Sequence, residues 1–274
     1  MELIQPDWPA PANVRAFTTT RAGGFSKDSW CSMNLGLRCG DDPIAVQRNR
    51  EKLVSYLPAA PQWLRQVHGR QVVTHSLASH DELEADGLVS SSSGQVCAVL
   101  TADCLPVLLC NRSGTRVAAA HAGWRGLAQG VLQATVRQMK EAPGEIMAWL
   151  GPAIGPEIYE VGEDVRQAFA EDLGVCFKQH GERWLLDLYG VARRILTQLG
   201  ITSVYGGQFC TSSDSERFFS YRRDGVTGRM ASVIWLASPK RGAGQMWGQN
   251  ERMSGTKIEV ESPLAPTSAA SRSR

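Results

Sequence analysis

The chain has 274 residues, of which 43% are hydrophobic and 20% are charged, enough for the buried core of one large domain or two small ones. The formal net charge is +2, but the segment beyond Pro239 carries a balance of +3, so the remainder is about −1. A weakly acidic body without a stripe of Lys and Arg offers no footprint for a nucleic-acid partner.

The N-terminus and the cysteines predict a cytoplasmic protein. Residues 1–11 are acidic and proline-rich, unlike a signal peptide, in which a basic start precedes an apolar run. The apolar runs of the chain are only long enough for strands, so we expect no membrane-spanning helix and no membrane partner. Seven cysteines is an odd number, and Cys97, Cys104 and Cys110 lie inside apolar segments. We therefore expect reduced, mostly buried thiols rather than disulfides.

The first elements along the chain are two strands and a helix. Residues 14–20 are rich in β-branched side chains and predict a strand. Asp42, followed by a proline, is typical of a helix start, and the helix should run to about residue 56. Arg50 lies on the apolar face of this helix, where it either borders the core or binds a ligand. Alternation over residues 63–68 predicts the second strand.

Buried strands dominate the middle of the chain. Continuous apolar runs are typical of strands that are buried on both faces. The runs lie at residues 95–101, 105–110, 117–120 and 146–150. The third run delivers His121 at its end, and an amphipathic pattern that starts near Gly123 predicts a helix after it.

The last third of the chain completes the predicted domain. Asp187 caps a helix that should end at Gly200, and residues 201–205 and 230–236 predict two more strands. Residues 1–237 therefore predict a single mixed α/β domain, in which buried sheets are flanked by helices. Residues 238–274 are rich in Ser, Gly, Pro and charge, and we expect a disordered tail there.

Three side chains that can bind metal stand where apolar strands end: His68, Cys104 and His121. Such strand ends are where α/β proteins place their sites. Two histidines and a thiolate suit zinc, and three protein ligands leave one tetrahedral position for water or substrate. The separations of 36 and 17 residues match no standard zinc spacing. From these residues alone, a hydrogen-bonded core histidine and an inert buried cysteine remain alternatives.

Three loops suggest contacts to a ligand. In the segment HAGWRG at 121–126, glycines allow close approach, and Arg125 beside helix N-terminal amides could hold phosphate or carboxylate. The run FFSYRRDG at 218–225 offers aromatic rings and arginines. The rigid loop GPAIGP at 151–156 precedes Glu160 and could shape a pocket. Each also has a plainer explanation: a strand-to-helix turn, a hairpin edge and the end of a strand.

Together these motifs resemble the YfiH-type family. Its members are variously named laccase-domain proteins, polyphenol oxidases, purine nucleoside phosphorylases and peptidoglycan editing factors. The resemblance runs over residues 3–236 and rests on SMNLG, QVHG, TADCLPV, HAGWRGL, GPAIGP, YEVG and FFSYRRDGVTGRMASVIWL, in this order. It implies a mixed α/β fold, likened to a bacterial toxin deamidase that uses Cys and His, and metal ligands at His68, Cys104 and His121. The tail departs from the family, whose chains typically stop near residue 236.

The resemblance implies an enzyme and leaves three reactions open. The first is zinc-dependent phosphorolysis of purine nucleosides such as adenosine and inosine, with adenosine deaminase activity on the side. The second is amide hydrolysis that removes a wrong amino acid, such as serine, from a UDP-MurNAc peptidoglycan precursor. The third is a metal-free hydrolase with Cys104 as nucleophile and His121 as base. The alternative that is not an enzyme is a nucleotide-binding protein whose zinc is structural.

We expect one zinc ion per chain, a small nucleoside or nucleotide-sugar substrate, and phosphate. Copper is a weaker expectation, since five histidines without an HxH pair cannot build the several copper sites of a laccase. The expected catalytic residues are Cys104, Asp103 as proton carrier, and Arg125. The expected substrate-binding residues are Asn34, Arg50, Glu160, Phe219, Tyr221 and Arg222.

Overall fold

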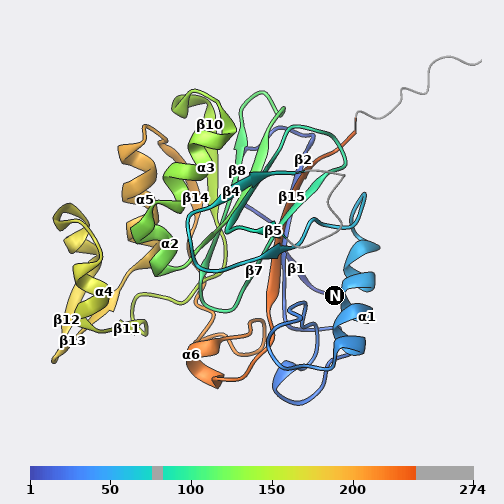
Figure 1. The fold of residues 1–274 in the computed structure, drawn as a ribbon, viewed down its shortest axis with the longest axis horizontal. Coiled ribbons are helices and arrows are strands. Elements are labelled where there is room, and N and C mark those ends of the chain that lie inside the picture. Colours follow the sequence, from blue (N-terminus) through green and yellow to red (C-terminus); the bar gives the residue numbers. More distant parts are fainter. Residues whose placement is uncertain (76–82, 239–274) are drawn as a thin grey trace, which may run out of the picture. The chain divides into compact units, whose positions relative to one another are not determined.

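Two stacked β-sheets form the centre of the protein, with helices outside them (Figure 1). The structure is a computed structural model that describes residues 1–75 and 83–238. The predicted tail therefore lies outside the described residues, apart from residue 238. No helix of the described part is both long and apolar enough to span a bilayer.

The larger sheet has six strands in the order β14-β10-β8-β9-β6-β4. Its outer pairs, β10 with β14 and β4 with β6, are parallel, whereas the inner pairs are antiparallel. Its strands are β4 (Val72–Thr74), β6 (Gly87–Ser90), β8 (Leu105–Asn111), β9 (Val117–Ala122), β10 (Ile146–Leu150) and β14 (Ser203–Gly206).

The second sheet is antiparallel and has the order β1-β2-β15-β7. Its strands are β1 (Leu3–Ile4), β2 (Val14–Thr19), β7 (Val96–Thr101) and β15 (Met230–Leu236). Two small sheets complete the strands: β3 (Leu64–Arg65) with β5 (Leu83–Glu84), and β11 (Glu160–Val161) with β13 (Arg183–Leu186) and β12 (Phe177–His180).

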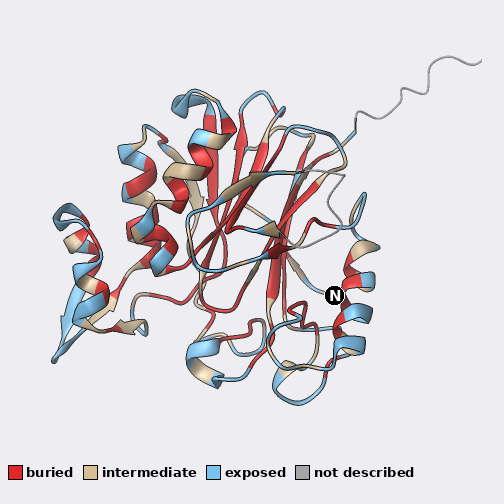
Figure 2. Cartoon of the chain, in the orientation of Figure 1, coloured by how far each residue is buried: buried red, intermediate tan, exposed pale blue. Residues whose placement is uncertain are grey.

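Four of the described helices cover the outer faces of the two central sheets. Apolar residues of α2, α3 and α5 pack on the six-stranded sheet, while Leu53 of α1 packs against the four-stranded sheet. Figure 2 shows the inward faces of these helices buried and their outward faces exposed. The helices are α1 (Pro43–Val54), α2 (Trp124–Gln129), α3 (Val131–Met139), α4 (Glu163–Gln167), α5 (Leu188–Gln198) and α6 (Tyr221–Asp224). Short 3-10 helices span Asp28–Trp30, Pro143–Glu145 and Glu171–Cys176.

Strand alternation divides the core into layers. In β8, Val107 and Leu109 face the helices, whereas Leu108 and Cys110 face the second sheet. A strand between two such layers needs apolar side chains on both faces, which is why its sequence reads as one continuous apolar run. This arrangement confirms the predicted mixed α/β fold with buried sheets.

Several predicted elements differ from the structure in informative ways. The helix expected from Gly123 is two helices, because Gly130 adopts a φ of 92° and breaks the run. Of the strand expected at 63–68, only Leu64–Arg65 form a strand, β3, because the chain enters a turn after it. Within the run at 218–225, residues 221–224 form the short helix α6, capped by Ser220, rather than a hairpin edge. Strands β4 to β6 and β11 to β13 were not predicted, because they are short and carry no long apolar run.

Candidate active site

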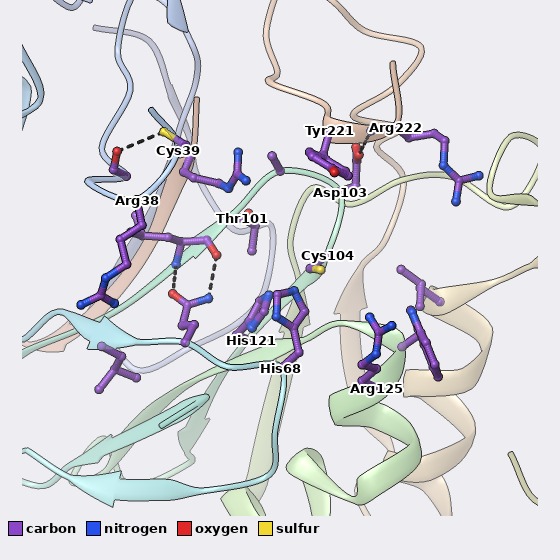
Figure 3. A pocket seen from close by; sticks show the side chains of 18 of the residues that line it. Arg38, Cys39, His68, Thr101, Asp103, Cys104, His121, Arg125, Tyr221 and Arg222 are labelled. Carbon is purple, nitrogen blue, oxygen red and sulfur yellow. Dashed lines mark hydrogen bonds between the residues drawn. The ribbon is translucent and has the colours of Figure 1, made fainter. Parts of the chain in front are cut away.

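The fold brings His68, Cys104 and His121 together. His68 lies in the turn after β3, Cys104 in the link between β7 and β8, and His121 within β9. Their possible ligand atoms all lie within 4.8 Å of one another (Figure 3). Within the described residues, these three side chains form the one group of three or more potential metal ligands. The group can therefore hold a metal ion.

Strand pairing explains how residues so distant in sequence meet. Strands β8 and β9 are antiparallel, and Pro106 pairs with His121, so the residue that precedes β8 lies beside the end of β9. The link that carries Cys104 also connects the two central sheets, since β7 belongs to one and β8 to the other. The site thus lies at the ends of the inner strands β8 and β9, where the chain crosses between the sheets, rather than at the carboxyl ends of parallel strands.

Asp86, which precedes β6, organises the group and was not predicted from the sequence. It is fully buried, and its Oδ1 lies 2.8 Å from Nδ1 of His121. The same carboxylate accepts hydrogen bonds from the backbone N–H groups of Val67, His68 and Gly69, at 3.2, 2.9 and 2.7 Å. One side chain therefore orients the ring of His121 and fixes the turn that carries His68, as carboxylates beside metal-binding histidines do.

Electrostatic coupling charges the pair formed by the half-buried Cys104 and the buried His121. Burial alone would raise the pKa of the Cys104 thiol, but the charge of His121 and hydrogen bonds from His121 and His68 lower it to about 6. Burial alone would lower the pKa of His121, but Cys104 and Asp86 raise it to about 9. Cys104 is thus held as a thiolate, the form that binds metal and the form that acts as a nucleophile.

Gly123 leaves space that the group needs. A Cβ placed at this position would lie 2.9 Å from Sγ of Cys104 and 3.3 Å from Cδ2 of His68. Any side chain here would displace the ligands, which explains the glycine in the HAGWRG segment. The free space and the set of two imidazoles with one thiolate both fit a zinc-like ion.

A cavity of about 510 Å³ opens over the three side chains. This volume lies within the usual range of small-molecule sites. Among the described residues, the lining includes five arginines and a single acidic residue, Asp103, so the cavity favours anions. The arginines are Arg38, Arg50, Arg125, Arg222 and Arg229. In Figure 3, Arg125 and Arg222 lie on one side of the His68, Cys104 and His121 group, and Arg38 lies on the other.

Several predicted site residues line this cavity. Arg125 is exposed and stacks on Trp124, with the guanidinium carbon 4.4 Å from the ring centroid. Tyr221 is 59% exposed, which leaves its ring available at the cavity wall. The guanidinium of Arg222 donates to the carbonyl of Glu160 at 2.7 Å. Arg50 also lines the cavity, with its Nε donating to the carbonyl oxygen of Leu35 at 3.0 Å.

Asp103 lies in the cavity with both carboxylate oxygens engaged. Oδ1 accepts from the hydroxyl of Thr211 at 2.6 Å, and Oδ2 accepts from the backbone N–H of Arg222 at 2.7 Å. These bonds connect the link between β7 and β8 to the start of α6, through Arg222, and to the loop before this helix, through Thr211. The geometry supports a role in holding α6, and the proton-carrier role stays a prediction.

The structure does not bring three of the predicted substrate-binding side chains to the cavity. Phe219 is fully buried in the core, so its ring cannot stack on a ligand there. The carboxylate of Glu160 instead pairs with Arg183 and His180. Asn34 is fully buried and hydrogen-bonds Gly36, through which it shapes the loop at the cavity wall.

Sequence reasoning also missed residues that line the cavity, notably Arg38, Gln66, Thr101, Tyr159 and Arg229. Four of them fall within motifs already noted: Gln66 in QVHG, Thr101 in TADCLPV, Tyr159 in YEVG and Arg229 in FFSYRRDGVTGRMASVIWL. A motif does not say which of its side chains face a ligand, because that depends on how distant segments pack.

Comparison with known proteins agrees with this picture. The family model described as multi-copper polyphenol oxidoreductase laccase matches residues 15–237. Purine nucleoside phosphorylase YfiH of Escherichia coli K12 is 52% identical over 240 residues, which cover 86% of this chain and 99% of the relative. A purine nucleoside phosphorylase of Pseudomonas aeruginosa is also 52% identical, over 85% of this chain and 98% of its own.

Solved structures show the same fold. A Neisseria meningitidis protein of family DUF152 matches with a TM-score of 0.84 and 50% identity, over 87% of this chain and all of that one (100%). YlmD from Geobacillus stearothermophilus matches with a TM-score of 0.82 and 31% identity, over 87% of this chain and 97% of that one.

Fold and site together define a mixed α/β protein with a candidate metal centre. Sequence and structural similarity narrow this class further: the chain belongs to the YfiH family, whose family model carries the laccase description. The resemblance predicted from the motifs is thereby confirmed.

Proposed function

We propose that this protein is a zinc-dependent purine nucleoside phosphorylase that acts on inosine and adenosine, with adenosine deamination as a side activity. The observation that carries the proposal is the position of the His68, Cys104 and His121 group inside an arginine-rich cavity of nucleoside size. The names of the relatives from Escherichia coli and Pseudomonas aeruginosa support the same reaction.

The donor set favours zinc over the several coppers of a laccase. His68, Cys104 and His121 would hold one ion with an open position, and such an ion supplies Lewis-acid chemistry to an oxygen of the bound substrate. Asp86 keeps the Nδ1 of His121 occupied, which leaves Nε2 for the ion. Within residues 1–75 and 83–238, no second group of three metal-binding side chains accompanies the first, as a multicopper enzyme would need.

The remaining cavity residues would hold the two substrates. Arg125 and Arg222 lie on the same side of the cavity and would bind phosphate, because guanidinium groups match its oxygens. Tyr221 and Trp124 offer rings against which the purine can stack. In phosphorolysis, a phosphate oxygen forms a bond to C1′ of the ribose while the bond from C1′ to N9 of the purine breaks. The electron pair leaves with the base, which takes up a proton.

The direct test is product analysis with the purified protein. Inosine and phosphate should yield hypoxanthine and ribose 1-phosphate, and no sugar phosphate should form when phosphate is omitted. Release of ribose without phosphate would identify a hydrolase instead. A protein that leaves inosine and adenosine unchanged would overturn the proposal and favour the amidase alternative.

Replacing Arg125 by alanine should weaken phosphate binding. Loss of a charged hydrogen bond costs about 1.5–3 kcal/mol, so we expect the KM for phosphate to rise about 10- to 100-fold. Steady-state kinetics at fixed inosine measures this change. Arg137→Ala on the exposed face of α3 is the matched control and should leave KM unchanged. An unchanged KM in Arg125→Ala would remove this arginine from the phosphate site.

A second candidate function rests on Asp86. The order Asp86, His121, Cys104 matches the acid, base and nucleophile of thiol hydrolases, and the lowered pKa of Cys104 suits a nucleophile. In this candidate, the thiolate attacks a carbonyl carbon and His121 protonates the leaving group. A cysteine bound to zinc cannot serve at the same time as the nucleophile, so metal content separates the two candidates.

A further inference from the structure

Thr101 lines the cavity and carries a buried hydroxyl that no described residue satisfies. Thr101 ends β7, is 1% exposed and lines the cavity. Its Oγ1 has no hydrogen-bond partner within residues 1–75 and 83–238. A buried hydroxyl without a partner destabilises a folded chain, so its presence at a site calls for a ligand that satisfies it.

The backbone around Thr101 is fixed independently of any ligand. The side chain of Gln66 donates to the carbonyl of Leu100 at 2.8 Å and accepts from its N–H at 2.7 Å (Figure 3). On the other side, Thr101 pairs with Met230 of β15. The hydroxyl is therefore held in place before a substrate arrives, which is the preorganisation that a binding group needs.

The position of Thr101 points to a contact with the ribose of a bound nucleoside. It lies three residues before Cys104, and Figure 3 shows it between the Arg38 side of the cavity and Cys104. Arg125 and Arg222 lie on the opposite side. In phosphorolysis, the ribose carries the reacting C1′, so a wall residue near the candidate metal group and away from the phosphate-binding arginines is placed to meet the sugar.

We propose that Oγ1 of Thr101 binds a ribose hydroxyl of the nucleoside and makes the enzyme select for it. This inference rests on the proposed phosphorylase function. A threonine hydroxyl can both donate and accept, as a sugar hydroxyl can, whereas the surrounding arginines only donate and suit anions. The hydroxyl, which has no partner in the described chain, thus gains one when the sugar is bound.

The test compares Thr101→Val, which keeps the shape, with Thr101→Ser, which keeps the hydroxyl. Loss of one neutral hydrogen bond should lower kcat/KM for inosine about threefold to tenfold in Thr101→Val, and Thr101→Ser should retain most of it. The same assays use 2′-, 3′- and 5′-deoxyinosine. For the analogue that lacks the contacted hydroxyl, wild type and Thr101→Val should have equal kcat/KM.

Thermal unfolding without substrate gives an independent readout. Because the hydroxyl has no partner in the described chain, Thr101→Val should keep the wild-type Tm or exceed it, although its activity falls. A merely structural hydroxyl would have a partner in the folded chain, and its loss would lower Tm instead. A lower Tm in Thr101→Val therefore overturns the inference.

The outcomes also separate this inference from the proposed function. Wild-type turnover of inosine that is unchanged in Thr101→Val, or lowered equally for all four nucleosides, overturns the ribose contact alone. If wild type binds inosine by calorimetry without converting it, the phosphorylase proposal fails, and weaker binding of inosine to Thr101→Val still supports the contact. A wild-type protein that does not bind inosine overturns both.

Discussion

Replacing Cys104 by alanine is expected to remove both the metal and the activity. Cys104 supplies the only thiolate among the three clustered donors, and without it two histidines remain. Loss of several kcal/mol of Lewis-acid stabilisation predicts a fall in kcat/KM for inosine of at least about a thousandfold. Zinc content, measured by elemental analysis of the purified variant, should fall from one per chain to a trace.

The control for this experiment is another cysteine. Cys31 is exposed, and Cys31→Ala should keep wild-type zinc content and activity. Circular dichroism of both variants shows whether the fold is retained. Full activity in Cys104→Ala would contradict the metal mechanism and the thiol mechanism alike, because each needs the sulfur.

Replacing Asp86 by asparagine should lower both the metal affinity and the thermal stability of the protein. The amide can accept hydrogen bonds through one atom only, so an NH₂ group would face either the N–H groups of Val67 and Gly69, or the N–H of His68 and the Nδ1 of His121. Loss of such a partner to a metal-binding histidine typically costs 10- to 100-fold in metal affinity. Breaking a buried charged contact costs about 3 kcal/mol, which predicts a Tm lower by about 6–12 °C.

Competition with a chromophoric chelator measures the zinc affinity of Asp86→Asn, and thermal unfolding measures its stability. Asp164→Asn in the exposed first turn of α4 is the matched control, and both quantities should stay at wild-type values. If Asp86→Asn bound zinc as tightly as wild type, Asp86 would have no role in orienting His121.

The buried strands and the helix caps could be predicted because their signals are local. The apolar run at residues 230–236 coincides with β15, and Asp187 caps α5 as expected, its side chain accepting from the N–H of Gly190. Conversely, the break at Gly130 could not be foreseen, because a glycine inside a helical pattern can continue the helix or end it.

The site could be predicted in part. Ligand side chains follow from residue type and motif, and the three metal-binding candidates do lie together. Asp86 was missed because its partners lie 17 to 35 residues away in sequence, and an aspartate before a glycine reads as a turn. Phe219 was expected in the cavity because an aromatic residue in a motif can belong to the core or to a site, and only packing decides which.

The most direct measurement is a zinc titration of the metal-free protein, with ribose 1-phosphate formation from inosine as the readout. Our account predicts no activity without metal, and activity that rises in proportion to added zinc until one ion is bound per chain. Alkylation of Cys104 before the titration should prevent recovery. A metal-free protein that is fully active, and that loses its activity only on alkylation of Cys104, would contradict the account and assign the site to a thiol enzyme.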